Sequence, residues 1–195
     1  MAGTLYITGD ETADELLNTD GNALLLGMLL DQQVPMEWAF KGPATLRQRL
    51  GHLDPAKIAA MDVDEFVAVC CEKPAIHRFP GSMGKRIHAV CTALVDDYDG
   101  EASNLWADVS DGKELYRRLK ALPGYGDEKS KIFVALLAKT QGVAPEGWQQ
   151  AAGKFGDDVP RSVADIHDET SLGEVREWKK AQKAAKKDKQ DRPVS

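Results

Sequence analysis

The chain has 195 residues and an apolar content of 43%, which suits one sizeable core or two small lobes. Its formal net charge of −6 argues against a generally basic nucleic-acid binder. Without a run of about 18 apolar residues or a basic-then-apolar start, we expect no membrane span and no signal peptide. The three cysteines, two of them adjacent, do not suit a disulfide framework and indicate a reducing, cytoplasmic compartment.

The charge is unevenly spread along the chain. From Ser171 onward the sequence contains eight basic and four acidic residues, so this tail carries a net +4 and the rest of the chain −10. A basic tail on an acidic body suggests contact with DNA, but many such tails only keep a protein soluble. We therefore divide the chain into a main domain over residues 1–170 and a basic, partly disordered helix and tail over residues 171–195.

Helical patterns dominate the sequence, so we predict an all-α fold. Residues 4–8 are β-branched and aromatic enough for one short isolated strand. Residues 23–30 are apolar nearly all round, which predicts a buried central helix. Gly42 and Pro43 predict a break before a further helix that ends at Leu50. A long amphipathic helix is expected over residues 83–98, and the last helix, from Ser171, is expected to fray by Asp188.

The most informative stretch is Leu122-Pro123-Gly124-Tyr125-Gly126, which separates two apolar helical patterns. Five residues are too few for a free loop, so we predict a tight hairpin between two helices. Pro123 restricts Leu122 and ends the first helix, while Gly124 and Gly126 allow positive φ and leave the backbone bare. Amides at the start of the second helix suit a phosphate oxygen, although a simple helix–helix turn has the same pattern.

Four features occur in order along the chain. They are an apolar helix ending in Gln-Gln, a Gly-x-x-x-Lys-Arg helix start at residues 81–86, the Leu-Pro-Gly-x-Gly hairpin, and a Gly/Pro loop bearing an acid. Over residues 23–148 this set resembles the helix-hairpin-helix (HhH-GPD) DNA glycosylase superfamily, which includes endonuclease III, and residues 29–38 resemble a small actinobacterial branch. The resemblance implies two helical lobes, base excision DNA repair, and a cytoplasmic, nucleoid-associated monomer that binds double-stranded DNA.

The resemblance also implies roles for hairpin and corner residues. Gly124, Tyr125, Gly126 and the nearby Lys129 are the expected DNA-binding residues of the hairpin, and the carbonyls of Leu122 and Tyr125 are the expected ligands of a monovalent cation.

The resemblance also implies a role for the polar pair Gln32 and Gln33. Gln33, or alternatively Gln32, resembles the side chain that fills the duplex when a nucleotide swings out, since an amide can both donate and accept. Helix C-capping is the alternative for both amides. Trp148 and Trp38 are candidates for a base pocket, with a core position as the alternative for Trp38; His77 is expected in a solvated loop.

The expected chemistry depends on a carboxylate that stabilises positive charge on the sugar or activates water. Relatives place an Asp about twenty residues after the second hairpin glycine, and here Glu146 occupies that position. Its extra methylene moves the carboxylate by about 1 Å, which can cost on the order of 100-fold in rate. Glu146 is alternatively a surface loop residue, with Asp157 and Asp158 as weaker candidates.

The lyase position of the resembled family holds Glu128 rather than Lys, and Lys129 lies one position, about 100° of helix, away. We therefore predict a monofunctional glycosylase, a hydrolase without Schiff-base lyase activity, cofactor or iron–sulfur cluster. Two alternatives remain open. One is a DNA-structure or lesion binder without catalysis, and the other is a helical interaction module whose acidic body binds a basic protein.

Overall fold

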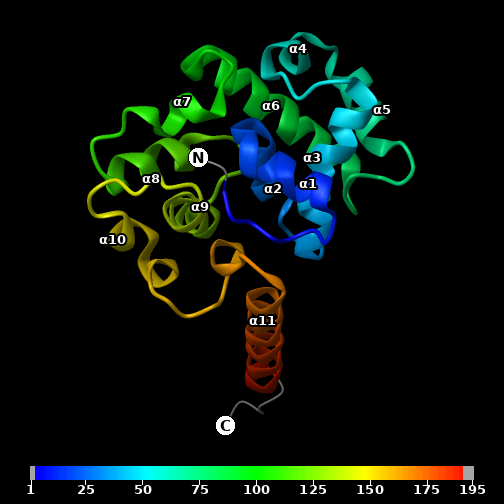
Figure 1. Ribbon diagram of the computed structural model, residues 1–195. Coiled ribbons are helices and arrows are strands. Elements are labelled where there is room, and N and C mark those ends of the chain that lie inside the picture. Colours follow the sequence, from blue (N-terminus) through cyan, green and yellow to red (C-terminus); the bar gives the residue numbers. More distant parts are fainter. Residues whose placement is uncertain (1–2, 191–195) are drawn as a thin grey trace.

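The computed structural model describes residues 3–190, with side chains to residue 185. In this part of the chain eleven α-helices and two 3-10 helices follow one another without a strand, so the predicted all-α fold is confirmed (Figure 1). The helices are α1 (Glu11–Thr19), α2 (Gly21–Leu30), α3 (Met36–Leu50), α4 (Pro55–Ala60), α5 (Val63–Cys71), α6 (Pro80–Tyr98), α7 (Ala102–Ala107), α8 (Gly112–Ala121), α9 (Asp127–Thr140), α10 (Trp148–Ala152), α11 (Glu169–Gln190), η1 (Gly153–Gly156) and η2 (Val163–Asp165).

The predicted central helix is α2. Asp20 caps its start, accepting hydrogen bonds from the amides of Asn22 and Ala23, and every residue from Asn22 to Leu30 is buried. The helix contacts α1, α3, α6, α7 and α9. Figure 1 shows α4, α5 and α6 on one side of it and α8, α9 and α10 on the other. Two groups of helices therefore share one central helix, whose C-terminus lies between them.

Two local predictions are wrong. The segment over residues 4–8 is extended but pairs with no strand in the described part of the chain, because side chains satisfy its amides instead. Asp14 Oδ1 accepts from the amides of Ile7 and Thr8, at 3.2 and 2.9 Å. The predicted break at Gly42 and Pro43 is also absent, since α3 continues through both. Both residues are buried in the packing of α3 on its neighbours, and this burial outweighs the local cost of an internal proline.

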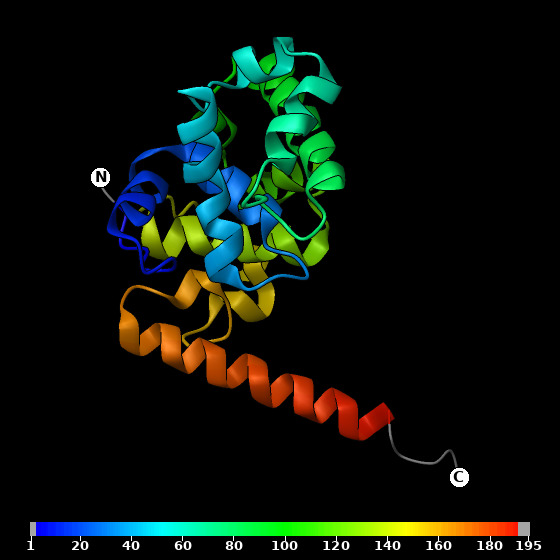
Figure 2. The ribbon, with the colours of Figure 1, turned by 90° about the vertical axis from the view of Figure 1, so that its right-hand side faces the viewer.

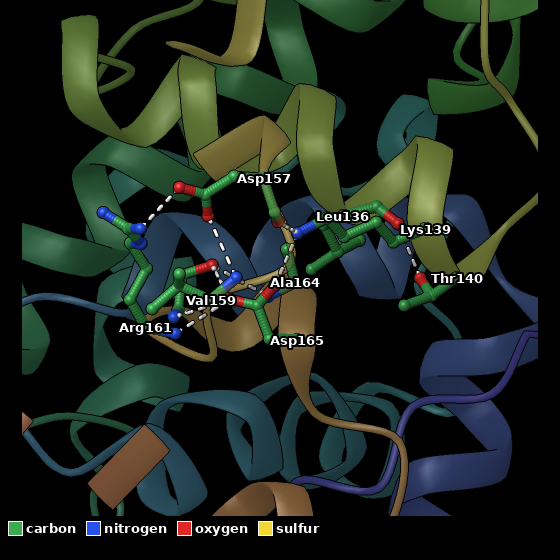
Figure 3. A network of polar contacts seen from close by, with 9 residues as sticks. Leu136, Lys139, Thr140, Asp157, Val159, Arg161, Ala164 and Asp165 are labelled. Atoms are coloured by element: carbon green, nitrogen blue, oxygen red, sulfur yellow. Dashed lines mark hydrogen bonds and ion pairs between the residues drawn. The ribbon is translucent and has the colours of Figure 1, made fainter. Parts of the chain in front are cut away.

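The connection between α9 and α11 is held by a network of charges (Figure 3). Lys139 of α9 donates to Asp165 Oδ1 at 2.6 Å, and Asp165 Oδ2 accepts from the amides of Arg161 and Ser162. Arg161 in turn pairs with Asp157 at 2.5 Å. The network fixes the segment before α11 against the end of α9, and therefore fixes where α11 begins.

The last helix is longer than expected. It begins at Glu169 and continues to Gln190, two residues beyond the predicted point of fraying. The predicted disorder at the end of the tail falls on residues 191–195, which lie outside the described residues. Across residues 3–190, none of the helices combines the length and apolar character needed to cross a membrane.

Candidate nucleic-acid interface

The predicted hairpin joins α8 to α9. The amide of Tyr125 donates to the Leu122 carbonyl at 3.1 Å, which closes the turn. The Tyr125 side chain is buried, its hydroxyl donates to the Leu25 carbonyl at 2.6 Å, and its ring meets Phe133 edge-on. Burial raises the pKa of Tyr125 well above its usual value. The Tyr125 side chain therefore anchors the turn to α2, which leaves only its backbone for contact with DNA.

Glycine stands at the two hairpin positions for different structural reasons. Gly124 has φ of +80°, and a Cβ there would lie 2.8 Å from Leu29 Cδ1, so the protein itself requires glycine. Gly126 has φ of −85° and does not use the left-handed region that glycine allows. A Cβ at Gly126 would meet no described atom within 4 Å. No side chain caps the start of α9, and the uncapped amides of a helix N-terminus suit an anion.

The second part of the surface is the α2–α3 corner, which we define as residues 28–37, from the last turn of α2 to the first turn of α3. Gln32 is held in place. Its Nε2 lies 2.9 Å from Met83 Sδ of α6, and its carbonyl lies 3.0 Å from His77 Nε2. Gln33 is exposed and has φ of +58°. That conformation is uncommon for a residue other than glycine and costs on the order of 1 kcal/mol. The corner therefore presents Gln33, rather than Gln32, to the outside.

Lys129 links the hairpin to this corner. Its Nζ donates to the carbonyls of Met28 and Leu29, at 2.8 and 2.6 Å. It thereby caps the C-terminus of α2, a role we had considered for Gln32 and Gln33. Burial lowers the pKa of Lys129 to about 8, although the nearby Asp31 partly opposes the shift. We expected Lys129 to face DNA, but its amine is directed into the protein, where it fastens the start of α9 to the corner.

Two carboxylates lie at the corner beside charges from α11. Burial raises the pKa of Asp31, and Lys179 followed by Lys129 partly offsets that effect. Glu37, in the first turn of α3, accepts a hydrogen bond from Arg176 Nε at 2.7 Å. The last helix therefore passes directly beside the α2–α3 corner. Sequence patterns gave no indication of this neighbourhood, because residues 31 and 179 are far apart in the chain.

An aromatic patch, which we define as Trp38, His77 and Phe79, lies beside the corner. The His77 ring centroid is 6.4 Å from that of Trp38 and 6.1 Å from that of Phe79. Trp38 is 40% exposed and Phe79 is 45% exposed, so the core position considered for Trp38 is wrong. Phe79 was missed by sequence reasoning, and its place just before the helix-starting Pro80 was the available signal.

Within the aromatic patch, His77 is the buried residue that supports the exposed rings of Trp38 and Phe79. It is not the solvated loop residue that we expected. It is only 1% exposed. Its Nδ1 accepts from the Phe79 amide at 3.0 Å, so Nε2 carries the proton donated to the Gln32 carbonyl. Burial lowers the pKa of His77. Neutral His77 therefore joins the loop that carries Phe79 to the α2–α3 corner.

Glu146 and Trp148 lie at the opposite end of the hairpin helices. The Glu146 carbonyl accepts from the Gly112 amide at 2.8 Å, and a Cβ at Gly112 would lie 2.5 Å from Trp148 Cα. Gly112 starts α8, whose ten residues span about 15 Å before the turn. The structure therefore groups these two residues with each other but not with the hairpin turn or the corner.

The weaker carboxylate candidates lie on the same side as Glu146. Asp157 pairs with Arg161 in the network of Figure 3, and Asp158 is exposed beside it and lines a groove together with Trp148. Neither carboxylate belongs to the corner, where Asp31 lies instead.

The helices α8 and α9, joined by a tight turn that contains Gly124 and Gly126, form a helix-hairpin-helix motif. The sequence matches the model of the HhH-GPD superfamily base excision DNA repair proteins over residues 26–192. The chain therefore belongs to the HhH-GPD superfamily, whose members act in base excision DNA repair and bind DNA. No curated protein sequence and no solved structure matches the chain significantly.

Proposed function

We propose that this protein is a monofunctional DNA glycosylase, which flips a damaged or mismatched base from duplex DNA and hydrolyses its N-glycosidic bond. One observation carries the proposal: Lys129 joins the open amides of the hairpin to the corner that presents Gln33. A phosphate on the hairpin and a plug in the duplex must be held at one fixed separation if a nucleotide is to stay flipped. Membership of the superfamily supports the same function.

Each part of the surface has a role in this proposal. The amides at Gly124 and Gly126 bind a phosphate, and Gln33 occupies the space that the flipped nucleotide leaves. Trp38 and Phe79 offer exposed rings for stacking, which contributes about 1–3 kcal/mol per base. Trp148, which we considered for the base pocket, lies beyond the other end of α8.

The hairpin turn is also the proposed site of a monovalent cation. The Leu122 carbonyl accepts from the Tyr125 amide and keeps a second lone pair, so it and the Tyr125 carbonyl suit the coordination of such an ion. The ion would supply positive charge near the bound phosphate. The hydrolysis proposed for this protein does not depend on another cofactor.

The carboxylate that acts on the sugar has two candidates. Glu146 occupies the sequence position that the family resemblance implies for the catalytic carboxylate, whereas Asp31 lies in the corner itself. Burial raises the pKa of Asp31, with Lys179 and Lys129 opposing the shift, and a carboxyl group whose pKa is shifted by burial beside specific charges is a candidate for a functional site. We keep both candidates because one comparison of variants separates them.

Lys129 supports the absence of lyase activity. A Schiff base needs an amine that can reach the sugar, and the Lys129 amine donates to two carbonyls of α2 instead. We therefore propose base release that leaves an intact abasic strand.

An excision assay tests the proposal. Duplexes that each carry one uracil, hypoxanthine or 8-oxoguanine are incubated with excess protein, and release of the base is measured in a single turnover. We expect release from at least one duplex, no strand cleavage without added alkali, and no trapped adduct with borohydride. Asp31→Asn or Glu146→Gln should abolish release while binding to an abasic duplex is retained, and the inactive variant identifies the carboxylate.

The alternatives have distinct outcomes in the same assay. Tight binding to an abasic duplex with no base released from any duplex would show a lesion binder without catalysis, which the separation of Glu146 from the hairpin favours. A protein that binds no duplex at any salt concentration would instead be a helical module for a basic protein partner.

A further inference from the structure

The first half of α11 is docked on the body. Leu172 and Val175 are buried, and the guanidinium of Arg161 lies 5.8 Å from the Trp178 ring centroid. Arg176 pairs with Glu37 of α3. These contacts fix the direction of α11, so that residues beyond Trp178 continue along a defined line past the α2–α3 corner.

The face of α11 that packs on the body changes character at this point. Residues 172, 175, 179 and 183 lie along one face of a helix. Leu172 and Val175 make this face apolar over the docked half, and then Lys179 and Lys183 make it basic. Lys179 is half-buried and acts electrostatically on Asp31, whereas Lys183 is exposed. A role in solubility alone does not explain why the face of α11 that packs on the body becomes basic beside the corner.

The proposed DNA surface combines its own arginines with several acids. Arg86 Cδ lies 3.6 Å from where a Cβ at Gly124 would be, and the guanidinium of Arg78 lies over the Phe79 ring. The chain before Ser171 carries a net −10, the hairpin turn is followed by the exposed acids Asp127 and Glu128, and the corner holds Asp31 and Glu37. Duplex DNA has one negative charge per about 1.7 Å of its axis. The neighbouring acids offset the charge of Arg78 and Arg86, and α11 brings further cations to the corner.

We propose that α11 is an arm that binds the DNA phosphate backbone beside the hairpin and the corner. Arg176 and Lys179 neutralise Glu37 and Asp31, and Lys180 and Lys183 contact phosphates beyond the corner. From Trp178 to Gln190 the helix extends about 18 Å further, and Figure 2 shows it projecting past the body. This inference rests on the proposed function, because it assigns the arm to the same DNA.

Salt dependence of binding tests the arm. The full chain is titrated against a duplex with one tetrahydrofuran abasic site at several salt concentrations, and log K is plotted against log salt. We compare Lys180→Ala/Lys183→Ala with the control Lys57→Ala/Lys113→Ala, which removes the same charge from exposed positions on α4 and α8. Each lost phosphate contact should reduce the slope by about 0.9, so the arm variant should lose about 1.8. The control should keep the slope of the unaltered protein.

The outcomes separate the arm from the proposed function. If both double variants keep the unaltered slope, or if both lose it equally, the arm is refuted while DNA binding stands. If the unaltered protein binds no duplex, the proposed function fails as well. Lys180→Arg/Lys183→Arg should restore the slope, because charge rather than helix formation is what the arm contributes. A slope that stays low with arginine would also refute the arm.

Discussion

The buried amine of Lys129 predicts an unusual dependence of stability on pH. Its pKa falls from 10.5 in the unfolded chain to about 8 in the folded protein. Between these values the unfolded chain binds more protons than the folded protein, so the free energy of unfolding rises with pH. The stabilisation is nearly absent at pH 7, reaches about 1.4 kcal/mol at pH 9 and about 2.5 kcal/mol at pH 10. Above pH 10.5 it levels off at about 3.4 kcal/mol.

This effect is measured by urea unfolding of the unaltered protein and of Lys129→Met, which keeps an unbranched apolar stem of four heavy atoms and removes the titrating amine. The free energy of unfolding of the unaltered protein minus that of the variant should rise by about 2.5 kcal/mol from pH 7 to pH 10.

Other titrating groups cancel in that difference. Burial raises the pKa of the Cys70 and Cys91 thiols to about 12, so both proteins lose stability above pH 9 equally. The matched variant Lys113→Met, at an exposed position, should give no such rise. The difference in free energy of unfolding between the unaltered protein and Lys129→Met could instead stay constant between pH 7 and pH 10. That result would refute the reasoning, because burial against α2 would then not lower the pKa of the amine.

Four further substitutions address the hairpin, the corner and the aromatic patch. Gly124→Ala should destabilise the protein by about 2–3 kcal/mol in urea, because it combines strain at positive φ with the close approach to Leu29. Gly126→Ala should leave stability within about 1 kcal/mol but weaken abasic-duplex binding; equal destabilisation by both changes would contradict the different roles. Gln33→Gly should relieve a strain of about 1 kcal/mol, offset in part by unfolded-state entropy, and weaken binding to an abasic duplex. Unchanged binding would reject Gln33 as the plug. Trp38→Ala should reduce affinity for the same duplex by about 1–3 kcal/mol in a titration, and unaltered affinity would reject stacking on the patch.

Local sequence signals predicted the elements that depend on local physics. The apolar run over residues 23–30 could only be stable if buried on all sides, and the structure buries α2 accordingly. Pro123 and Gly124 between two amphipathic patterns left only a tight turn. The break expected at Gly42 and Pro43 did not occur because packing on α2 outweighs helix propensity.

The candidate site was predicted less completely than the fold. Counting along the chain from Gly126 located Glu146, but the return of the chain to the start of α8 places it at the far end of the hairpin helices. Residue counting cannot give this distance, because it depends on how the loop after α9 folds back. The exposed Phe79 and the buried His77 likewise depend on which loop residues find a neighbour.

By itself the sequence determined that the chain is all-helical, that α2 is its core, and that a tight glycine-containing turn joins two helices. Those properties follow from side-chain periodicity and backbone restriction, which act between residues close in the chain. Only the tertiary structure decided what surrounds the end of α2. Lys129 is turned inward to α2. Arg176 pairs with Glu37, and Lys179 acts electrostatically on Asp31, from a helix about 140 residues later in the chain. These contacts arise because buried carbonyls and carboxylates need donors and cations, and the fold brings them from segments that no local pattern connects.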